Sequence, residues 1–286
     1  MKYILLLLLL TFNAVAYDAF IKPAQLKELQ KNNNLVLLDV SSKSFYDQSH
    51  ISGALHVDID KFIKRKYFKR AFNLNKIVQS QMKKLGINEN SKVVIYSRNK
   101  EEDLLHSSYL AMIFALHGFE DISILNGGYM AWVFDYSFLV SSKSSHAPSD
   151  GTYKIKQNKN IIVNTNYLKK NLHDSQIIDS RNSSKYDGKI KSNNTKLLGH
   201  ITNAKNYYYK DSFFDDLTIK DDIEQNFISE LGLQKNQQII VYGDTVFTSS
   251  MNWYILYKKF GFANAKIYPE PFYKLVNKKL PFTLYK

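Results

Sequence analysis

Short runs of apolar residues recur along the chain, and stretches with helical spacing lie between them. The runs at 93–96 and 239–242 are each followed by a segment, 107–117 or 250–260, in which apolar residues return every three or four positions. That period is typical of a helix, whereas a short unbroken apolar run is typical of a buried parallel strand. Further strands are predicted at 122–125 and 265–268. Strand, helix and strand in this order predict parallel βαβ units with helices on both faces of the sheet.

The two halves of the chain repeat one another. Residues 85–96 and 231–242 align without a gap, and other landmarks recur in the same order. They are Leu37-Leu38-Asp39 with Ile177-Ile178-Asp179, and His50–Ala54 with His200–Ala204. A duplication explains this order, and the polar stretch that begins at Ser141 is the natural linker. We therefore expect an α/β protein with domains at 17–140 and 159–286, joined by a linker at 141–158.

Residues 1–16 have the pattern of a secretory signal peptide. Lys2 precedes an unbroken apolar run from Ile4 to Leu10, and Ala14 and Ala16 supply the small residues of a cleavage site. A membrane anchor is the alternative, although the apolar segment is short of the about 20 residues that a spanning helix needs. No later stretch is long and apolar enough to cross a bilayer. We expect an exported chain, in the bacterial periplasm or secreted.

Composition excludes several kinds of chemistry. The 286 residues include no cysteine, so disulfides, thiolate metal sites and thiol nucleophiles are excluded. The seven histidines show no metal-ligand spacing, and we expect neither a metal nor a cofactor. The net charge of +13 comes from lysines spread over the chain. This favours a solvated surface, with contact to an acidic envelope surface as the alternative, and no motif indicates a nucleic-acid partner.

The landmarks of both halves resemble rhodanese domains. The first half carries Leu38-Asp39, His50–Ala54 and Leu125–Trp132, and the second carries Asp179-Ser180-Arg181, Gly199–Ala204 and Ile239–Tyr242. The resemblance covers nearly all of residues 30–286. The tandem arrangement is similar to that of the thiosulfate and mercaptopyruvate sulfurtransferases. It implies two tandem rhodanese folds, each a mostly parallel sheet with helices on both faces. It also implies that the second domain carries the catalytic loop, in which a cysteine thiolate accepts sulfur and passes it on.

In this chain the position that resembles the nucleophile is Gly243, which has no side chain to carry sulfur. Persulfide transfer is therefore excluded unless a partner supplies the thiol, and we assign no catalytic residue. Asp244 adds a negative charge, and Ser249 and Ser250 are predicted to open and cap the following helix. Hydroxyl catalysis is disfavoured, because no histidine lies in or next to this segment. The degenerate loop, as a candidate binding site, comprises Gly243, Asp244, Thr245, Val246, Phe247, Thr248 and Ser249.

Three further residues are assigned to the pocket or to its support. Asp179 and Arg181 are expected to form a structural ion pair at the end of a strand. His200, like His50 in the first half, is expected to seat a loop against the sheet together with a tight turn. The matching first-domain loop, residues 97–103, holds three acids and no nucleophile motif.

Three functions remain open on this basis. The first is a non-catalytic module that binds a small oxyanion, a peptide or a protein partner. The second is a sulfurtransferase that uses an external thiol. The third is an envelope structural protein that binds acidic surfaces. The missing nucleophile favours the first function.

Overall fold

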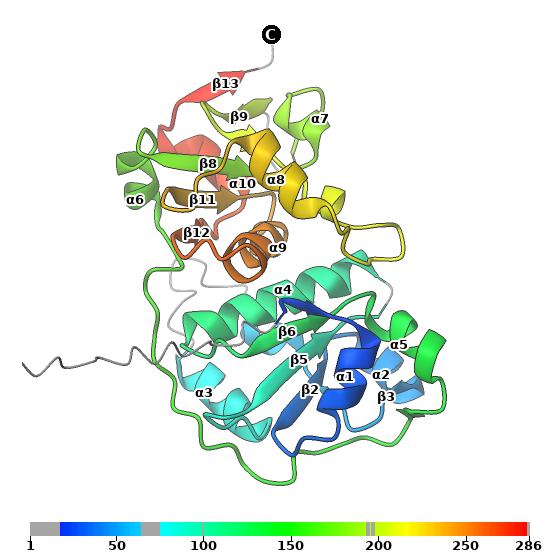
Figure 1. Ribbon diagram of the computed structural model, residues 1–286. Helices are drawn as coiled ribbons and strands as arrows, with labels where there is room; N and C mark the ends of the chain where they lie inside the picture. Colours follow the sequence, from blue (N-terminus) through cyan, green and yellow to red (C-terminus); the bar gives the residue numbers. More distant parts are fainter. Residues whose placement is uncertain (1–17, 64–74, 99, 193–194, 196–197, 285–286) are drawn as a thin grey trace, which may run out of the picture.

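The computed structural model describes residues 18–63, 75–98, 100–192, 195 and 198–284. The predicted signal peptide at 1–16 lies outside these residues. Two α/β domains stack on one another, with one helix from each at their junction (Figure 1). Within the described ranges, no helix has both the length and the apolar character needed to cross a membrane.

The first domain is built on a five-stranded parallel sheet in the order β1-β6-β5-β2-β4. A separate antiparallel pair joins β3 to β7. The strands are β1 (Phe20–Ile21), β2 (Leu35–Asp39), β3 (His50–Ile51), β4 (Leu55–His56), β5 (Lys92–Tyr96), β6 (Ile122–Leu125) and β7 (Val140–Ser141). The predicted strands at 93–96 and 122–125 are confirmed.

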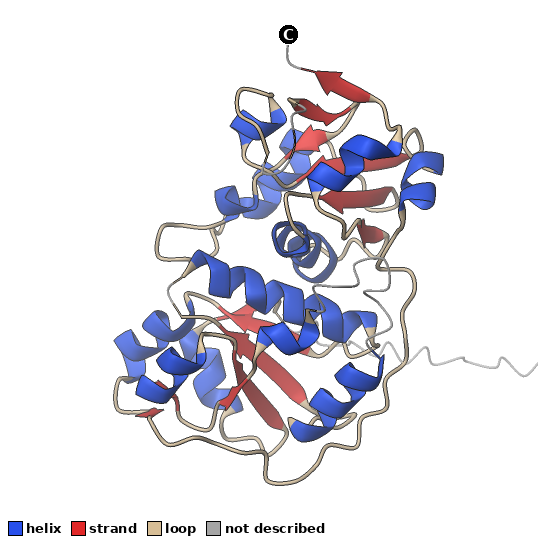
Figure 2. Ribbon diagram, turned by 180° about the vertical axis from the view of Figure 1, so that it is seen from behind, coloured by secondary structure: helices blue, strands red, loops and turns tan. Residues whose placement is uncertain are grey.

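Helices cover both faces of this sheet (Figure 2). Alternate strand residues point to opposite faces, so that Leu38 joins one core cluster and Leu37 joins another. The first cluster includes residues of α3 and α4, and the second includes residues of α1 and α5. The helices are α1 (Pro23–Leu29), α2 (Lys43–Gln48), the 3-10 helix η1 (Ile59–Phe62), α3 (Asn75–Lys84), α4 (Glu101–Leu116) and α5 (Gly128–Tyr136).

The second domain repeats the plan with a four-stranded parallel sheet in the order β10-β8-β11-β12. Its antiparallel pair joins β9 to β13. The strands are β8 (Ser175–Asp179), β9 (Gly199–Ile201), β10 (Lys205–Asn206), β11 (Gln238–Tyr242), β12 (Ala265–Ile267) and β13 (Phe282–Leu284). The helices are α6 (Thr165–Lys170), α7 (Ser183–Tyr186), η2 (Tyr209–Ser212), α8 (Ile223–Leu231), α9 (Val246–Tyr254), the π-helix η3 (Ile255–Lys259), α10 (Phe272–Leu275) and η4 (Val276–Lys278).

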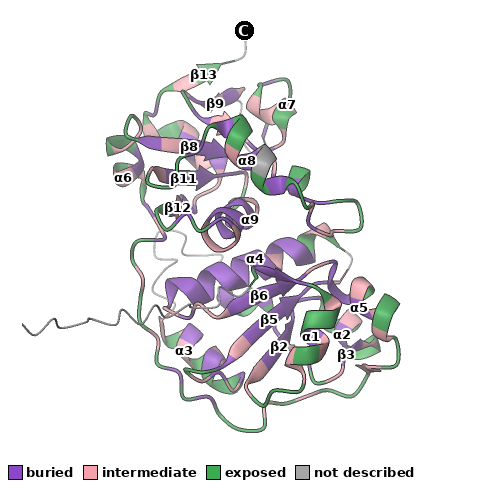
Figure 3. Ribbon diagram, in the orientation of Figure 1, coloured by how far each residue is buried: buried purple, intermediate pink, exposed green. Residues whose placement is uncertain are grey.

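Helices α4 and α9 form the junction between the domains (Figure 3). Most of α4 is apolar and buried all round, as a helix must be when it is covered on both sides. The Ser108 and Ser250 hydroxyls lie 3.2 Å apart across the junction, and the Tyr254 hydroxyl donates to the Ala19 carbonyl at 2.7 Å. One apolar core therefore runs from the first domain into the second.

Both junction helices begin earlier than the sequence pattern predicts. Helix α4 begins at Glu101 rather than near Ser107, and α9 begins at Val246 rather than near Ser250. The first turn of α4 is acidic, which suits the positive end of a helix but breaks the apolar period. The start of α9 is fixed by a cap, which we describe next.

Candidate functional site

The degenerate loop is short because only three residues, 243–245, lie between the end of β11 and the start of α9. Thr245 is the N-cap residue, and its hydroxyl accepts from the Thr248 N–H at 3.3 Å. The Thr248 hydroxyl in turn accepts from the Thr245 N–H at 3.3 Å. This reciprocal pair is a capping box, which satisfies donors that would otherwise face outward from the helix.

The capping predicted for Ser249 and Ser250 is therefore wrong. Both serines lie inside α9, where their hydroxyls donate back to carbonyls of the same turn. Serines often bond in this way within helices. Thr245 occupies the cap because its backbone is extended, with φ −141° and ψ 166°.

The space beside Gly243 is already filled. A Cβ atom placed there would lie 2.5 Å from the Thr248 hydroxyl oxygen and 3.4 Å from the Ser249 nitrogen. A side chain at residue 243 would thus meet the hydroxyl that completes the capping box. The capping box also engages the Thr245 and Thr248 amides, so these two donors are not available to a bound anion.

The charges of the loop are paired within the protein. The Asp244 carboxylate lies 2.5 Å from the Lys185 ammonium, with the two side chains 20% and 22% exposed. Across the junction, Glu101 accepts from the Tyr209 hydroxyl and pairs with Lys210. Asp244 therefore neutralises a cation that would otherwise attract an anionic ligand to the loop.

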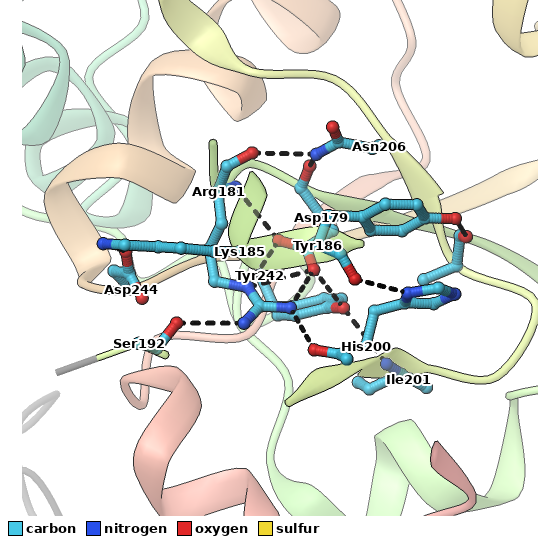
Figure 4. A network of polar contacts seen from close by, with 12 residues as sticks. Asp179, Arg181, Lys185, Tyr186, Ser192, His200, Ile201, Asn206, Tyr242 and Asp244 are labelled. Atoms are coloured by element: carbon cyan, nitrogen blue, oxygen red, sulfur yellow. Dashed lines mark hydrogen bonds and ion pairs between the residues drawn. The ribbon is translucent and has the colours of Figure 1, made fainter. Parts of the chain in front are cut away.

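Asp179 and Arg181 lie at the centre of a buried network (Figure 4). Asp179 ends β8, and its carboxylate accepts from Arg181 Nη2 at 2.6 Å and from the Tyr242 hydroxyl at 2.6 Å. Arg181 also donates to Ser192 Oγ at 3.0 Å and to the Gly199 carbonyl at 2.9 Å. The predicted ion pair is confirmed, and its donors hold the segment between β8 and β9 in place.

The same network surrounds the buried Tyr242 hydroxyl. Burial and the adjacent Asp179 carboxylate raise the pKa of Tyr242 well above its usual value. The phenol therefore stays protonated and serves as a donor to Asp179 and as an acceptor from the Ile201 N–H at 3.3 Å. These contacts are structural, since every group points at another part of the fold.

His200 on β9 and His50 on β3 have equivalent surroundings. His200 Nδ1 lies 2.8 Å from the Tyr186 carbonyl, and its ring stacks on the Tyr186 ring at 3.7 Å. His50 makes the same contacts with Tyr46, at 2.7 Å and 3.8 Å. A tight turn follows each histidine, with Asn203 at φ 67° in the second domain. Each histidine thus ties the short strand that carries it to a short helix, α2 or α7, and seating of a loop against the sheet stays a prediction.

The expectation that no histidine lies next to the degenerate loop is wrong. A histidine does lie next to it, because His106 on α4 packs against Phe247 with ring centroids 5.2 Å apart. Burial lowers the pKa of His106, which favours the neutral imidazole. The Thr248 and Ser249 hydroxyls nevertheless donate to the Thr245 and Val246 carbonyls, so these contacts do not make a nucleophile and base pair.

A groove of about 790 Å³ lies beyond the carboxyl ends of β2 and β4, and we call it the first-domain groove. Its lining includes Phe45, His56, Asp103 and His106, and Phe247 closes it from the second domain. Sequence reasoning missed this groove, because its residues come from separate segments. The three acids at 101–103 are the only feature of the sequence analysis that pointed to this region. Among the described residues, no group of histidines and acids is arranged to hold a metal ion.

The sequence profile of the rhodanese-like domain matches residues 22–135 and 164–277. The chain belongs to the rhodanese family. Among relatives of this rhodanese chain is the sulfur carrier protein TtuD of Thermus thermophilus, 25% identical over 78% of this chain and 81% of the relative. A putative thiosulfate sulfurtransferase of Mycolicibacterium smegmatis is 26% identical over 79% of this chain and 82% of the relative.

A solved structure confirms the fold of the rhodanese chain. The 3-mercaptopyruvate sulfurtransferase SseA from Escherichia coli aligns with a TM-score of 0.72 and 20% identity. The alignment covers 89% of this chain and 99% of SseA. The two tandem α/β domains predicted from the repeat are thus shown as two rhodanese-like domains.

Proposed function

We propose that this rhodanese chain does not transfer sulfur by itself and acts as an exported binding protein. One observation carries the proposal: Gly243 stands where the nucleophile would be, and the Thr248 hydroxyl fills the adjacent space. The pairing of Asp244 with Lys185 supports it, because the loop then offers no spare cation to an anionic donor. Residues 1–16 support export. The ligand we favour is an organic molecule or a peptide rather than a small oxyanion.

Sulfur transfer from thiosulfate to cyanide tests this proposal. We expect the parent protein and Gly243→Cys to be inactive, the latter because its side chain meets the Thr248 hydroxyl. The double variant Gly243→Cys/Thr248→Ala opens that space and should gain activity, since a thiolate near a helix N-terminus is activated. The single variant Thr248→Ala, which lacks a thiol, is the matched control. Transfer by the parent protein would refute the proposal.

A second function is favoured by the relatives, several of which are named putative thiosulfate sulfurtransferases. The chain would then act with a thiol supplied from outside. The same assay with added glutathione and dithiothreitol separates the two functions. A rate above that of the thiol alone, abolished in Phe247→Trp at the loop, would favour the enzyme.

The third function, an envelope protein that binds acidic surfaces, rests on the net charge of +13. Sedimentation with vesicles that contain anionic lipid tests it. Binding that disappears at about 0.15 M salt would indicate only weak surface attraction.

A further inference from the structure

The first-domain groove contains a buried carboxylate that the fold leaves without a full set of partners. Asp103, on the first turn of α4, is 7% exposed, and its Oδ2 atom has no hydrogen-bond partner among the described residues. Among the described residues, Asp103 takes part in no ion pair. A buried carboxylate oxygen without a donor is costly, and Asp103 is therefore an acceptor that a ligand could satisfy.

Nearby cations are engaged elsewhere or lie at the rim. Arg98 donates to the Phe45 and Ser49 carbonyls at 2.7 and 2.9 Å, which directs its guanidinium toward α2. Lys100 is exposed, and its ammonium lies 4.6 Å from the centre of the Phe45 ring. Lys43 pairs with Asp47 at the exposed end of α2. Lys61, which also lines the groove, is exposed. These cations therefore leave the buried wall of the groove acidic.

The position and size of the groove suit a small ligand. Parallel α/β sheets bind ligands beyond the carboxyl ends of their strands, and here the groove follows β2 and β4. Its volume of about 790 Å³ lies within the usual range for small-molecule sites. Phe45, His106 and Phe247 give it aromatic walls. Arg98 and Lys100 already contact the Phe45 ring, and the Phe247 ring is of a kind that attracts organic cations.

We propose that the first-domain groove binds an organic cation, whose primary ammonium or guanidinium group sits on Asp103. The contact would be a charge-assisted hydrogen bond, which is stronger than a neutral one. Free amines and the basic side chains of a peptide share this chemistry. The inference deepens the proposed function by naming the site and the ligand class, and it rests on the chain acting as a binding protein.

Calorimetry with simple probes tests the inference. Butylammonium, butylguanidinium and a capped Ala-Arg-Ala peptide are titrated into the purified chain, with butylurea as the neutral control. We expect saturable binding of the cations and none of butylurea. The peptide arm identifies the source: binding of the peptide supports a basic side chain, and binding of the small cations alone supports a free amine. Absence of saturable binding by any cation would overturn the inference.

Variants locate the site. Asp103→Asn should weaken binding by about tenfold or more, because it removes the charge of the acceptor. The melting temperature of this variant should equal or exceed that of the parent at neutral pH, which a purely structural aspartate would not allow. Asp174→Asn, an exposed change in the second domain, removes the same charge and should leave binding intact. Equal binding by folded Asp103→Asn would refute the assignment, and Phe247→Ala tests it independently through the aromatic wall.

The pH profile adds a further readout. Burial and the neighbouring Asp39 raise the pKa of Asp103 to about 6. Asp103 faces Asp39 from β2, Glu102 from α4, and Arg98 and Lys100 from the preceding loop. The other titratable side chains that line the groove are Lys43, His56, Asp58, Asp60, Lys61 and His106. Affinity for the cations should fall by about tenfold at about pH 5, where Asp103 is protonated. A flat profile would count against Asp103 as the acceptor.

The two hypotheses fail separately. Cation binding by a chain that also transfers sulfur would refute the proposed function and leave the groove assignment standing. A chain that neither transfers sulfur nor binds a cation would refute the groove assignment alone.

Discussion

Arg181 places a guanidinium in the interior of the second domain, where nearly every donor has a partner. Its Cζ atom also lies 3.4 Å from the centre of the Phe272 ring, so the group is held between a carboxylate and an aromatic face. In the first domain the equivalent aspartate, Asp39, accepts from the Ser41 amide and hydroxyl instead. The two domains thus solve the same problem, a buried strand-end carboxylate, with different donors.

Removing Arg181 should destabilise the protein strongly. Arg181→Leu leaves Asp179 buried without its main counter-charge, so we expect the free energy of unfolding to fall by about 3–5 kcal/mol. Urea denaturation measures this loss. Lys31→Leu, which removes an exposed pair with Glu28, is the control and should change stability by less than about 1 kcal/mol. The double variant Asp179→Asn/Arg181→Leu should recover part of the loss, and similar losses for Arg181→Leu and Lys31→Leu would contradict this account.

At the residue scale, the sequence shows that the nucleophilic cysteine is missing, but it does not show which group fills the space of that side chain. The family resemblance places Gly243 at the position of the nucleophile, and the motif Asp179-Ser180-Arg181 indicates the ion pair. The Thr248 hydroxyl that fills the space of the nucleophile is not visible in the sequence, because its position depends on where α9 begins. The unpartnered oxygen of Asp103 is also invisible, since burial comes from tertiary packing.

At the element scale, strands were easier to predict than helix starts. The apolar runs at 93–96 and 239–242 have the sharp boundaries of buried parallel strands, which the structure confirms. Helix starts depend on caps, and Thr245 with Thr248 is a less familiar box than one closed by an acid. The acids at 101–103 suggest a loop by composition, but they begin a helix because acidic side chains are stabilising at a helix N-terminus.

Helix α9 is fastened to the first domain by a buried tyrosine. Tyr254→Phe removes the hydroxyl that donates to the Ala19 carbonyl, and we expect a loss of about 1 kcal/mol in the free energy of unfolding. Ala19 keeps its bond from the Ile124 N–H at 2.8 Å, which limits the loss. Tyr257→Phe, which affects a half-buried bond to Glu120, is the matched control and should cost less. Equal losses in urea denaturation would show that burial does not set the difference.

At the scale of the whole molecule, the candidate binding surfaces arise from the way the domains stack. The repeat predicts two similar domains, but it gives no signal for the packing of α4 on α9. That packing brings His106 to Phe247 and closes the first-domain groove with a residue of the second domain. A single-domain view of either half would therefore miss the groove, and the sequence alone offers no period or motif that joins these distant segments.

The export that we propose would also be a property of the whole chain, and it predicts a particular N-terminus. Cleavage after Ala16 would leave Tyr17 first and keep β1, whose Phe20 packs against Tyr254 and Phe213 in the shared core. Expression of the full sequence in a bacterial host should yield a periplasmic protein with the intact mass of residues 17–286. Ala14→Lys/Ala16→Lys should block cleavage, because the processing site requires small side chains. Recovery of the unprocessed parent in the cytoplasm would refute export, whereas an unprocessed parent in the membrane fraction would indicate that residues 1–16 act as an anchor.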